Sequence, residues 1–459
     1  MNEKNKNEQI KYQTISKWQK FCFGFGALGK DANCNMISCF YMLFLTDTLF
    51  IDPAFIGVLF FVARIWDAIN DPMMGMIVDN THTKYGKFRI WLSVGTIINS
   101  IVLVAMFKSF ELQGTALYVF VAVTYIIYGM TYTIMDVPYW SWLPNLTNDP
   151  REREKVSVIP RIFASAASFL VGTFGLYVIN WFNKLNNQSN SIAETGFTWF
   201  AVLIAIVFIF TISVTVFNVK EKPTSGIKNQ KTSFKQAIHI IVKNDQLLAF
   251  IGLLLAYNLC TTFVRSFAVY YFKNVCNNQF LYSAFAATFI AEMAGLFCMP
   301  YISKKAGRAT TFKLACTLPI IGLVLLGTAG CVIPQNVVAV VISSAIFLFG
   351  SGLSTGVTTC CMADVIDYGE LKFGVRNESI TCSTQTFLMK FALAMAGLFT
   401  GFGLKIVGYD AKLAVQSSGT IMGIRILMLV LPIMLVIISY IVYHKFGEFH
   451  CIGHGFTPL

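Results

Sequence analysis

Two aspartates interrupt a long apolar stretch in the segment ARIWDAINDP. Residues three or four apart in a helix lie on one face, so Asp67 and Asp71 project together, with Asn70 beside them. Carboxylate and amide oxygens are the ligands that a hard cation requires. Two alternatives fit the same residues: a proton could neutralise one carboxylate, or Arg64 could balance a structural aspartate. The spacing favours a cation site.

A second polar stripe occurs in the segment TYTIMDVPYW. Tyr132, Asp136 and Trp140 recur every four residues and therefore share one helix face. A carboxylate accepts hydrogen bonds from sugar hydroxyls, and an aromatic ring can stack on the C–H face of a sugar. In an alternative interpretation, which is compatible with the first, Asp136 pairs with Arg161. We predict a carbohydrate contact here, and Thr133, one residue off the stripe, could offer its hydroxyl to a neighbouring helix.

Five more charged residues lie inside other apolar stretches, where a charge at the centre of a membrane helix costs about 2.5–3.5 kcal/mol. Lys30 and Asp31 adjoin in the first of these stretches. Lys390 lies far from either end of its stretch, so its ammonium group reaches water with difficulty. We expect it to point at the carboxylates of the other half of the chain. Arg265 and Glu292 have no role that the sequence decides, and they could pair with each other.

The elements that must position these residues are long apolar helices. Of the 459 residues, 56% are hydrophobic and 13% are charged, and the mean hydropathy is +0.63. A soluble domain has roughly 25% charged residues, so this composition predicts a polytopic all-α membrane protein. A helix of about 20 apolar residues spans a bilayer, whereas a single strand would leave its backbone unsatisfied. The twelve predicted spans are 21–46, 54–79, 90–108, 115–143, 156–183, 197–217, 245–273, 281–302, 310–332, 335–365, 377–407 and 420–444.

Lysine and arginine gather in the N-terminal tail and in alternate loops, whereas the segment TDTLFIDPA between the first two spans has none. The positive-inside rule therefore predicts that both termini are cytoplasmic. Because the charges cluster in these short segments, the formal net charge of +12 does not indicate a nucleic-acid partner. Most of the 12 cysteines lie in apolar spans, where a thiol acts as a small hydrophobic group.

A polar segment in the middle of the chain divides the spans into two sets of six. Weak internal repeats support a duplication, since MDVPYW ends the fourth span and MADVIDYG ends the tenth. This arrangement predicts the major facilitator fold, with two six-helix bundles and a midplane site between them. The predicted parts are a cytoplasmic tail 1–20, a bundle 21–217, a cytoplasmic loop 218–244 with a short surface helix, a bundle 245–444 and a cytoplasmic tail 445–459.

Other classes of protein fit the sequence poorly. An enzyme is disfavoured because there is no Gly-rich phosphate loop, no metal-ligand cluster in the spans and no nucleophile–base pair, and we expect no cofactor. The segments between spans are too short for the soluble domain of a sensor. The five histidines lie in loops or at span ends, which argues against a histidine proton relay.

Six motifs suggest a family when they are taken together: RIWDAINDPMMG, YGKFRIW, YGMTYTIMDVPYWS, DPREREKV, DYGELKFGVRNES and QTFLMK. With their spacing over nearly the whole chain, they resemble the glycoside–pentoside–hexuronide:cation symporter family of the major facilitator superfamily. The resemblance implies a Na⁺ site and a sugar site, assigned by position. The implied cation ligands are Asp67, Asn70, Asp71 and Thr133. The implied sugar contacts are Lys30, Asp31, Tyr132, Asp136, Trp140, Arg161, Gln385, Thr386 and Lys390.

The resemblance also implies an activity, which is secondary symport of a melibiose-like glycoside with Na⁺ by alternating access. Lys390 would link the two sites and Arg64 would balance charge. We expect a monomer in the inner membrane of a bacterium, with Li⁺ or H⁺ as other coupling ions. Ser38 and Thr355 replace aromatic residues of the family pattern, which leaves the preferred sugar open. The alternative is an H⁺-coupled or uncoupled carrier of another sugar or small metabolite.

Overall fold

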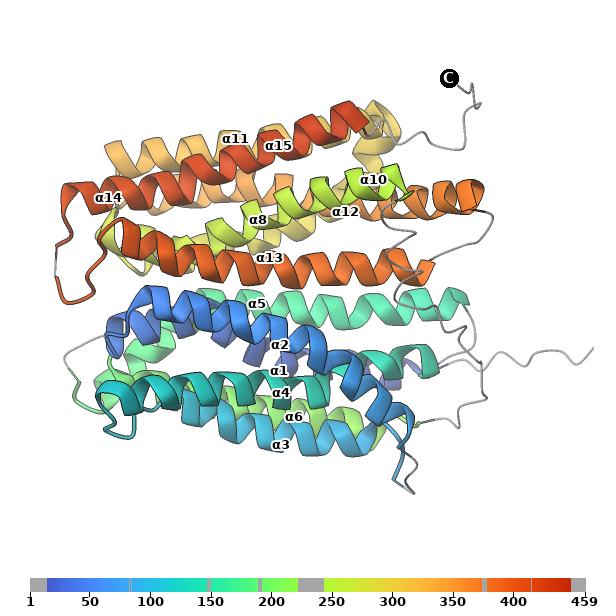
Figure 1. The fold of residues 1–459 in the computed structure, drawn as a ribbon, viewed down its shortest axis with the longest axis horizontal. Helices are drawn as coiled ribbons and strands as arrows, with labels where there is room; N and C mark the ends of the chain where they lie inside the picture. Colours follow the sequence, from blue (N-terminus) through green and yellow to red (C-terminus); the bar gives the residue numbers. More distant parts are fainter. Residues whose placement is uncertain are drawn as a thin grey trace, which may run out of the picture. The chain divides into compact units, whose positions relative to one another are not determined.

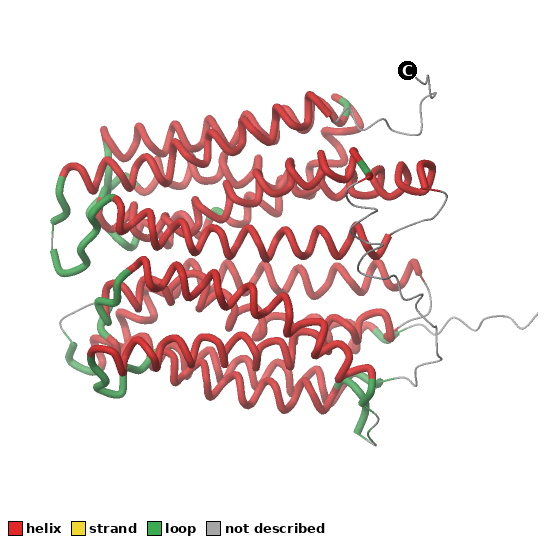
Figure 2. The backbone as a smooth tube through the Cα atoms, viewed as in Figure 1, coloured by secondary structure: helices red, strands yellow, loops and turns green. Residues whose placement is uncertain are grey.

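The computed structural model describes residues 15–81, 83, 85–146, 150–188, 192–221, 243–373, 378–413 and 415–446. Over these residues all of the regular secondary structure is helical, and loops occur only between helices (Figure 2). The predicted all-α class is therefore confirmed. The surface helix predicted within 218–244 falls almost entirely outside the described residues, as do most of the two predicted tails.

Every predicted span coincides with described helix. The first half of the chain contains α1 (Lys17–Met36), the π-helical turns η1 (Ile37–Tyr41) and η2 (Phe44–Thr48), α2 (Pro53–Asp79), α3 (Arg89–Met106), α4 (Gly114–Leu146), α5 (Pro150–Leu185) and α6 (Glu194–Asn218). The second half contains α8 (Asp245–Asn274), α9 (Leu281–Ala287), α10 (Phe289–Ala306), α11 (Arg308–Val332), α12 (Val337–Phe373), α13 (Glu378–Ile406), α14 (Ser418–Arg425), η3 (Ile426–Val430) and α15 (Leu431–Phe446). Figure 1 labels most of these elements along the chain.

Among the described residues, ten helical stretches are long and apolar enough to cross a membrane. Large apolar side chains cover their outward faces, as at Ile206 and Phe210 on α6 and at Ile437, Ile438 and Ile441 on α15. Lipid tails accept such faces because they make no hydrogen bonds. The remaining two predicted spans, α1 with its π-helical turns and α2, are those that carry Lys30, Asp31 and the paired aspartates. The chain is a multi-pass membrane protein.

The chain forms two compact units. The first contains residues 1–37, 66–171 and 182–227. Within it α1 packs on α6, and α3 packs on both α4 and α6. A side chain at Gly29 would overlap Thr211 and the backbone of Phe208, so only glycine lets α1 and α6 approach this closely.

The second unit contains residues 38–65, 172–181 and 228–459. Here α12 packs on α10 and α11, and α8 packs on α13 and α15. A side chain at Gly352 would overlap the carbonyl oxygen of Glu292, so this glycine brings α12 against α10 beside a half-buried acid. The second unit also holds the distal part of the first span and the first turns of α2, which connect it covalently to the first unit.

Candidate functional site

The predicted cation ligands meet where α2 lies against α4, in the first unit. The Thr133 hydroxyl donates a hydrogen bond of 3.0 Å to Oδ1 of Asp71. Asp67 is buried, and a Cβ atom at Gly129 of α4 would lie 2.8 Å from its Oδ1. The two acids therefore reach α4 at neighbouring levels, and a larger residue at Gly129 would displace Asp67.

The chemistry of this set suits a monovalent cation or a proton. Two carboxylates on one helix face repel each other when both are ionised, and low polarity around them strengthens that repulsion. The Asn70 amide nitrogen is buried with no hydrogen-bond partner among the described residues, which marks an unsatisfied polar position next to the acids. Arg64 lies on the same helix but in the second unit, so its charge-balancing role stays a prediction.

The predicted sugar contacts gather around the Lys30 ammonium group, also in the first unit. Nζ of Lys30 donates to Oδ1 of Asp136 at 2.8 Å, to Oδ1 of Asp31 at 3.3 Å and to the Tyr132 hydroxyl at 3.3 Å. Lys30 is 2% exposed. A buried ammonium is stable only when it is paired in this way, so α1 and α4 are held together by one cation between two anions.

Aromatic rings enclose the same ammonium group. Nζ of Lys30 lies 5.3 Å from the ring centroid of Trp140 and 5.7 Å from those of Tyr132 and Tyr139. A cation within about 6 Å of a ring face is attracted to it. Trp140 is 37% exposed, whereas Tyr139 is fully buried. Trp140 is thus the most accessible ring of this group, since Tyr132 is half-buried.

One oxygen of the Lys30 cluster is unsatisfied. Oδ2 of Asp31 is buried and has no hydrogen-bond partner among the described residues. A buried acceptor without a donor is costly, since it loses its hydration without replacement. A sugar hydroxyl could supply that donor while a C–H face rests on Trp140. The alternative pairing of Asp136 with Arg161 is not found in the described part of the chain, where Asp136 pairs with Lys30.

The structure does not bring every predicted residue to this cluster. Arg161 lies exposed on α5 in the first unit, with no hydrogen bond to the Lys30 cluster in the described residues. Gln385, Thr386 and Lys390 lie on α13 in the second unit, so their sugar contacts remain predictions.

A buried amide network behind the Lys30 cluster escaped the sequence analysis. Asn33 donates to Oδ1 of Asn99 at 2.6 Å and accepts a hydrogen bond from the Tyr128 hydroxyl at 3.0 Å. Asn99 in turn donates to the Thr131 hydroxyl at 2.9 Å. Tyr128 stacks on Tyr132, with ring centroids 6.0 Å apart. The network joins α1, α3 and α4 one turn from Lys30, so it helps to fix the helices that carry the predicted sugar contacts. The feature of the sequence that could have revealed this network is the presence of Asn33 and Asn99 within apolar spans.

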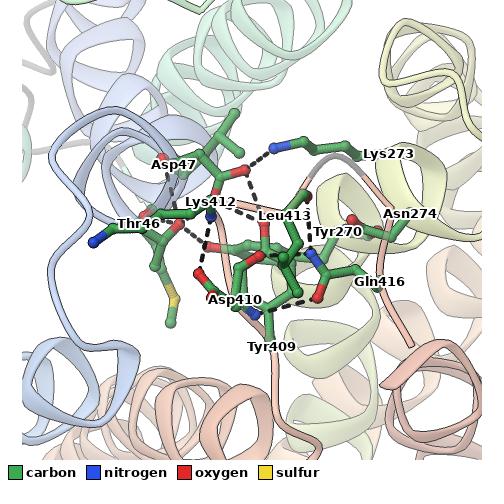
Figure 3. Close-up of polar contacts among 12 residues, drawn as sticks. Thr46, Asp47, Tyr270, Lys273, Asn274, Tyr409, Asp410, Lys412, Leu413 and Gln416 are labelled. Atoms are coloured by element: carbon green, nitrogen blue, oxygen red, sulfur yellow. Dashed lines mark hydrogen bonds and ion pairs between the residues drawn. The ribbon is translucent and has the colours of Figure 1, made fainter. Parts of the chain in front are cut away.

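A second lysine–carboxylate cluster, centred on Asp47, lies in the second unit (Figure 3). Lys273 pairs with Oδ2 of Asp47, and the Tyr409 hydroxyl lies 2.9 and 3.0 Å from the two carboxylate oxygens. Thr46 donates to Oδ1 at 2.6 Å, and its own oxygen lies 3.0 Å from the Tyr270 hydroxyl. Burial and the Asp47 charge raise the pKa of Tyr409, so this phenol remains a donor.

The Asp47 cluster connects segments that are distant in sequence. Asp47 belongs to the end of the first span, Lys273 to the last turn of α8 and Tyr409 to the loop after α13. A second ion pair lies nearby in sequence, where Lys405 donates to Asp52 at 2.9 Å. Burial raises the pKa of Asp52, but hydrogen bonds from Lys405 and from the Ala54 backbone outweigh this and lower it. Gly57 and Gly401 let α2 and α13 touch at the backbone.

The fold and the sequence both have known counterparts. The chain is 26% identical over 427 residues to an isoprimeverose transporter of Lactiplantibacillus pentosus, covering 92% of this chain and 87% of that one. It is 27% identical over 447 residues to the inner membrane symporter YicJ of Escherichia coli K12, covering 95% and 93%. A bacterial homologue of the lysosomal transporter Spinster, solved in an inward-facing conformation, superposes with a TM-score of 0.70 at 12% identity, covering 96% of this chain and all of that one.

The profile of one protein family covers nearly the whole chain. It matches residues 22–447 and is described as MFS/sugar transport protein. The match includes most of α1 with Lys30, α2 with the paired aspartates, α4 with Thr133 and Asp136, and α13 with Lys390. The chain therefore belongs to the MFS/sugar transport family, whose members are transporters of the major facilitator superfamily and not enzymes.

Proposed function

We propose that the chain is a secondary active transporter that moves a glycoside together with a cation, and that the coupling ion is Na⁺. The proposal assigns the ion to Asp67, Asn70, Asp71 and Thr133. It assigns the sugar to the Lys30 cluster, which comprises Lys30, Asp31, Tyr132, Asp136 and Trp140.

The observation that carries this proposal is that α4 bonds to both groups of residues. Thr133 on α4 donates to Asp71, and its neighbour Tyr132 accepts from Lys30. A change in the backbone position at Thr133 must therefore shift Tyr132 as well. An ion that draws Thr133 toward Asp71 would change the donors and acceptors available to a sugar. This is a physical route for coupling, in which each ligand alters the other's affinity by the same factor.

The coupled cycle also requires that the path to the site closes on one side at a time. We assign the closure of one side of this path to the Asp47 cluster together with the Asp52–Lys405 pair. These contacts join the end of the first span, and the loop that follows it, to α8 and α13. The two six-helix bundles 21–217 and 245–444 would rearrange as these contacts form and break. Lys390, Gln385, Thr386 and Arg161 would complete the sugar site during this movement.

The remaining assignments rest on similarity. The name of YicJ places that symporter in the inner membrane, and we propose the same place for this chain, as a monomer. A melibiose-like glycoside is the proposed cargo. We also propose that, within the family, the chain resembles the bacterial melibiose permease. Ser38 and Thr355 are both exposed. Neither side chain has an aromatic ring that could stack on a sugar. A cargo of different shape from melibiose is compatible with these two residues.

The test is glycoside binding by the purified protein with and without Na⁺. A panel of glycosides is titrated in choline, Na⁺ and Li⁺ buffers at two pH values. The proposal expects Na⁺ to lower the Kd of the bound glycoside by about 5–150-fold, with the reciprocal effect of sugar on Na⁺ affinity. A lower Kd at acid pH alone would favour H⁺ coupling through the same acids. A Kd unaffected by ion and pH would favour the uncoupled carrier.

A further inference from the structure

A third charged cluster lies outside both groups of residues described above. Arg265 on α8 donates to Oε2 of Glu292 on α10 at 2.6 Å. Ser351 on α12 donates to the other oxygen, Oε1, at 3.2 Å. The Arg265 guanidinium lies 4.9 Å from the ring centroid of Phe289. Three helices of the second unit therefore fix this pair in one geometry.

The accessible face of α8 at this level is polar. Between residues 256 and 272 the side chains that are not buried are Asn258, Leu259, Thr261, Thr262, Arg265 and Ser266. Five of these six are polar, and they recur three or four residues apart. The outward faces of α6 and α15 carry isoleucine and phenylalanine instead. Asn258, Thr261 and Thr262 already donate to backbone carbonyls of α8, so the group on this face that lipid tolerates least is the charged Arg265.

The Arg265–Glu292 pair reaches that accessible face. Its two side chains are 41% and 27% exposed, although both lie within membrane-spanning helices. A partly exposed ion pair contributes little to stability, so holding helices together is a weak reason for this one. The accessible N–H groups of the guanidinium and the lone pairs of the carboxylate point to a ligand that both donates and accepts.

The charge of the pair selects among such ligands. Glu292 neutralises Arg265, so the pair carries no net charge. A vicinal diol matches it, since one hydroxyl can accept from the guanidinium while the next donates to the carboxylate. A sugar carboxylate does not match, because it would face Glu292 as well as Arg265. Phe289 adds an apolar surface beside the guanidinium.

We propose that Arg265 and Glu292 form a subsite for the hydroxyl groups of a neutral sugar, which excludes uronic acids. This subsite lies on the second unit and is additional to the Lys30 cluster of the first. It rests on the proposed glycoside transport and specifies the class of cargo, a neutral glycoside. Ser351 acts as a positioning residue, because it contacts Glu292 and not the ligand.

The experiment compares Glu292→Gln with the wild type in binding of neutral glycosides and of the corresponding glucuronides. The variant keeps the shape of the side chain and leaves Arg265 uncompensated. We expect the Kd of the neutral glycoside to rise about tenfold or more, as for loss of a hydrogen bond to a charged group, while glucuronide binding appears or strengthens. Arg265→Gln should weaken the neutral glycoside similarly and gain no glucuronide binding.

The matched control is Asp245→Asn, which breaks the Asp245–Lys372 ion pair between α8 and α12, two of the three helices that hold the Arg265–Glu292 pair. It should leave the preference between neutral and acidic sugars unchanged. If Glu292→Gln lowers the Tm but leaves both Kd values within twofold of the wild type, the pair is a structural clamp and the subsite is refuted. If the wild type binds no glycoside, the proposed function fails. If Asp136→Asn weakens glycoside binding and Glu292→Gln leaves the Kd within twofold of the wild type, only the subsite fails.

Discussion

The Lys30 cluster and the Asp47 cluster are built from the same residue types, yet they differ in how completely their charges are bonded. Each has a lysine, an aspartate and tyrosine hydroxyls. In the Asp47 cluster both carboxylate oxygens accept hydrogen bonds, and the aspartate side chain is fully buried. In the Lys30 cluster two carboxylates share one ammonium, and an oxygen of Asp31 has no donor among the described residues.

We propose that this difference separates a closed contact from a binding surface. A fully bonded cluster has nothing to offer a ligand and can only form or break as a whole. A partly bonded cluster is stabilised further when a ligand supplies the missing donor. The comparison therefore predicts that disrupting the Lys30 cluster abolishes binding, and that disrupting the Asp47 cluster changes access to the site while binding persists.

The largest expected effect comes from Lys30→Ala. Removing the ammonium leaves Asp31 and Asp136 as uncompensated acids, a loss that typically costs about 3–5 kcal/mol. Glycoside affinity should fall about 100-fold or more, measured by titration of the purified protein. Lys405→Ala removes a lysine from an exposed pair and should change affinity less than twofold. A folded Lys30→Ala protein that binds glycoside normally would break the comparison.

Thr133→Ala should have the next largest effect. The hydrogen bond to Asp71 is to a charged group, and its loss is worth about 1.5–3 kcal/mol. Na⁺ affinity should fall about tenfold, while glycoside affinity in Na⁺-free buffer should be unchanged. Thr133→Ser keeps the hydroxyl and should restore Na⁺ affinity. Equal loss of sugar binding with and without Na⁺ would place Thr133 in the sugar site instead.

Asp47→Asn tests the closed contact. The substitution removes the charge that pairs with Lys273, so the contact should open more often and uptake should change, while equilibrium glycoside binding stays within about twofold. Cys276, three residues after Lys273, is 2% exposed and serves as a native probe. Its alkylation rate should rise about fivefold, consistent with a loss of about 1 kcal/mol. Asp52→Asn, in an exposed pair, should raise the rate less. An unchanged Cys276 rate together with lost sugar binding would reverse the roles of the two clusters.

The smallest effect is expected from Asn99→Ala, behind the Lys30 cluster. It removes three hydrogen bonds of Asn99, those with Asn33, Thr131 and the Tyr128 backbone, and leaves the Asn33 amide without that acceptor, at a cost of about 1–3 kcal/mol of stability. The Tm should fall, and glycoside affinity should fall only about two- to threefold, because no ligand contact is lost. A loss as large as that of Lys30→Ala would make Asn99 part of the binding surface.

Much of the fold followed from the sequence because a bilayer leaves few choices. Apolar runs of the required length predicted all the spans, and the same physics made Asp67, Asp71 and Lys30 visible as costly exceptions. The pairing of Arg265 with Glu292 was one suggestion, and it is confirmed. The pairing of Asp136 with Lys30 was not predicted, since Arg161 was the partner considered; helix spacing gives the face of a residue and not its neighbour.

The Asp47 cluster was missed for a related reason. The segment TDTLFIDPA has the composition of an ordinary polar loop, and the partners of Asp47 are 226 and 362 residues away. Only the packing of the first span against α8 and α13 brings them together. The one local signal was Lys273, a lysine in the last turn of a helix that was otherwise apolar at its end.

The two π-helical turns of the first span have a mechanical consequence. The boundary between the two compact units falls at residues 37 and 38, where η1 begins. In a π-helical turn each N–H bonds five residues back, one more than in an α-helix. Conversion of such a turn to α-helix changes the phase of everything beyond it by about 100°, the rotation of one residue. A single slip of this kind would turn Asp47 away from Lys273 without moving Lys30, because Lys30 lies before η1 and Asp47 lies beyond it.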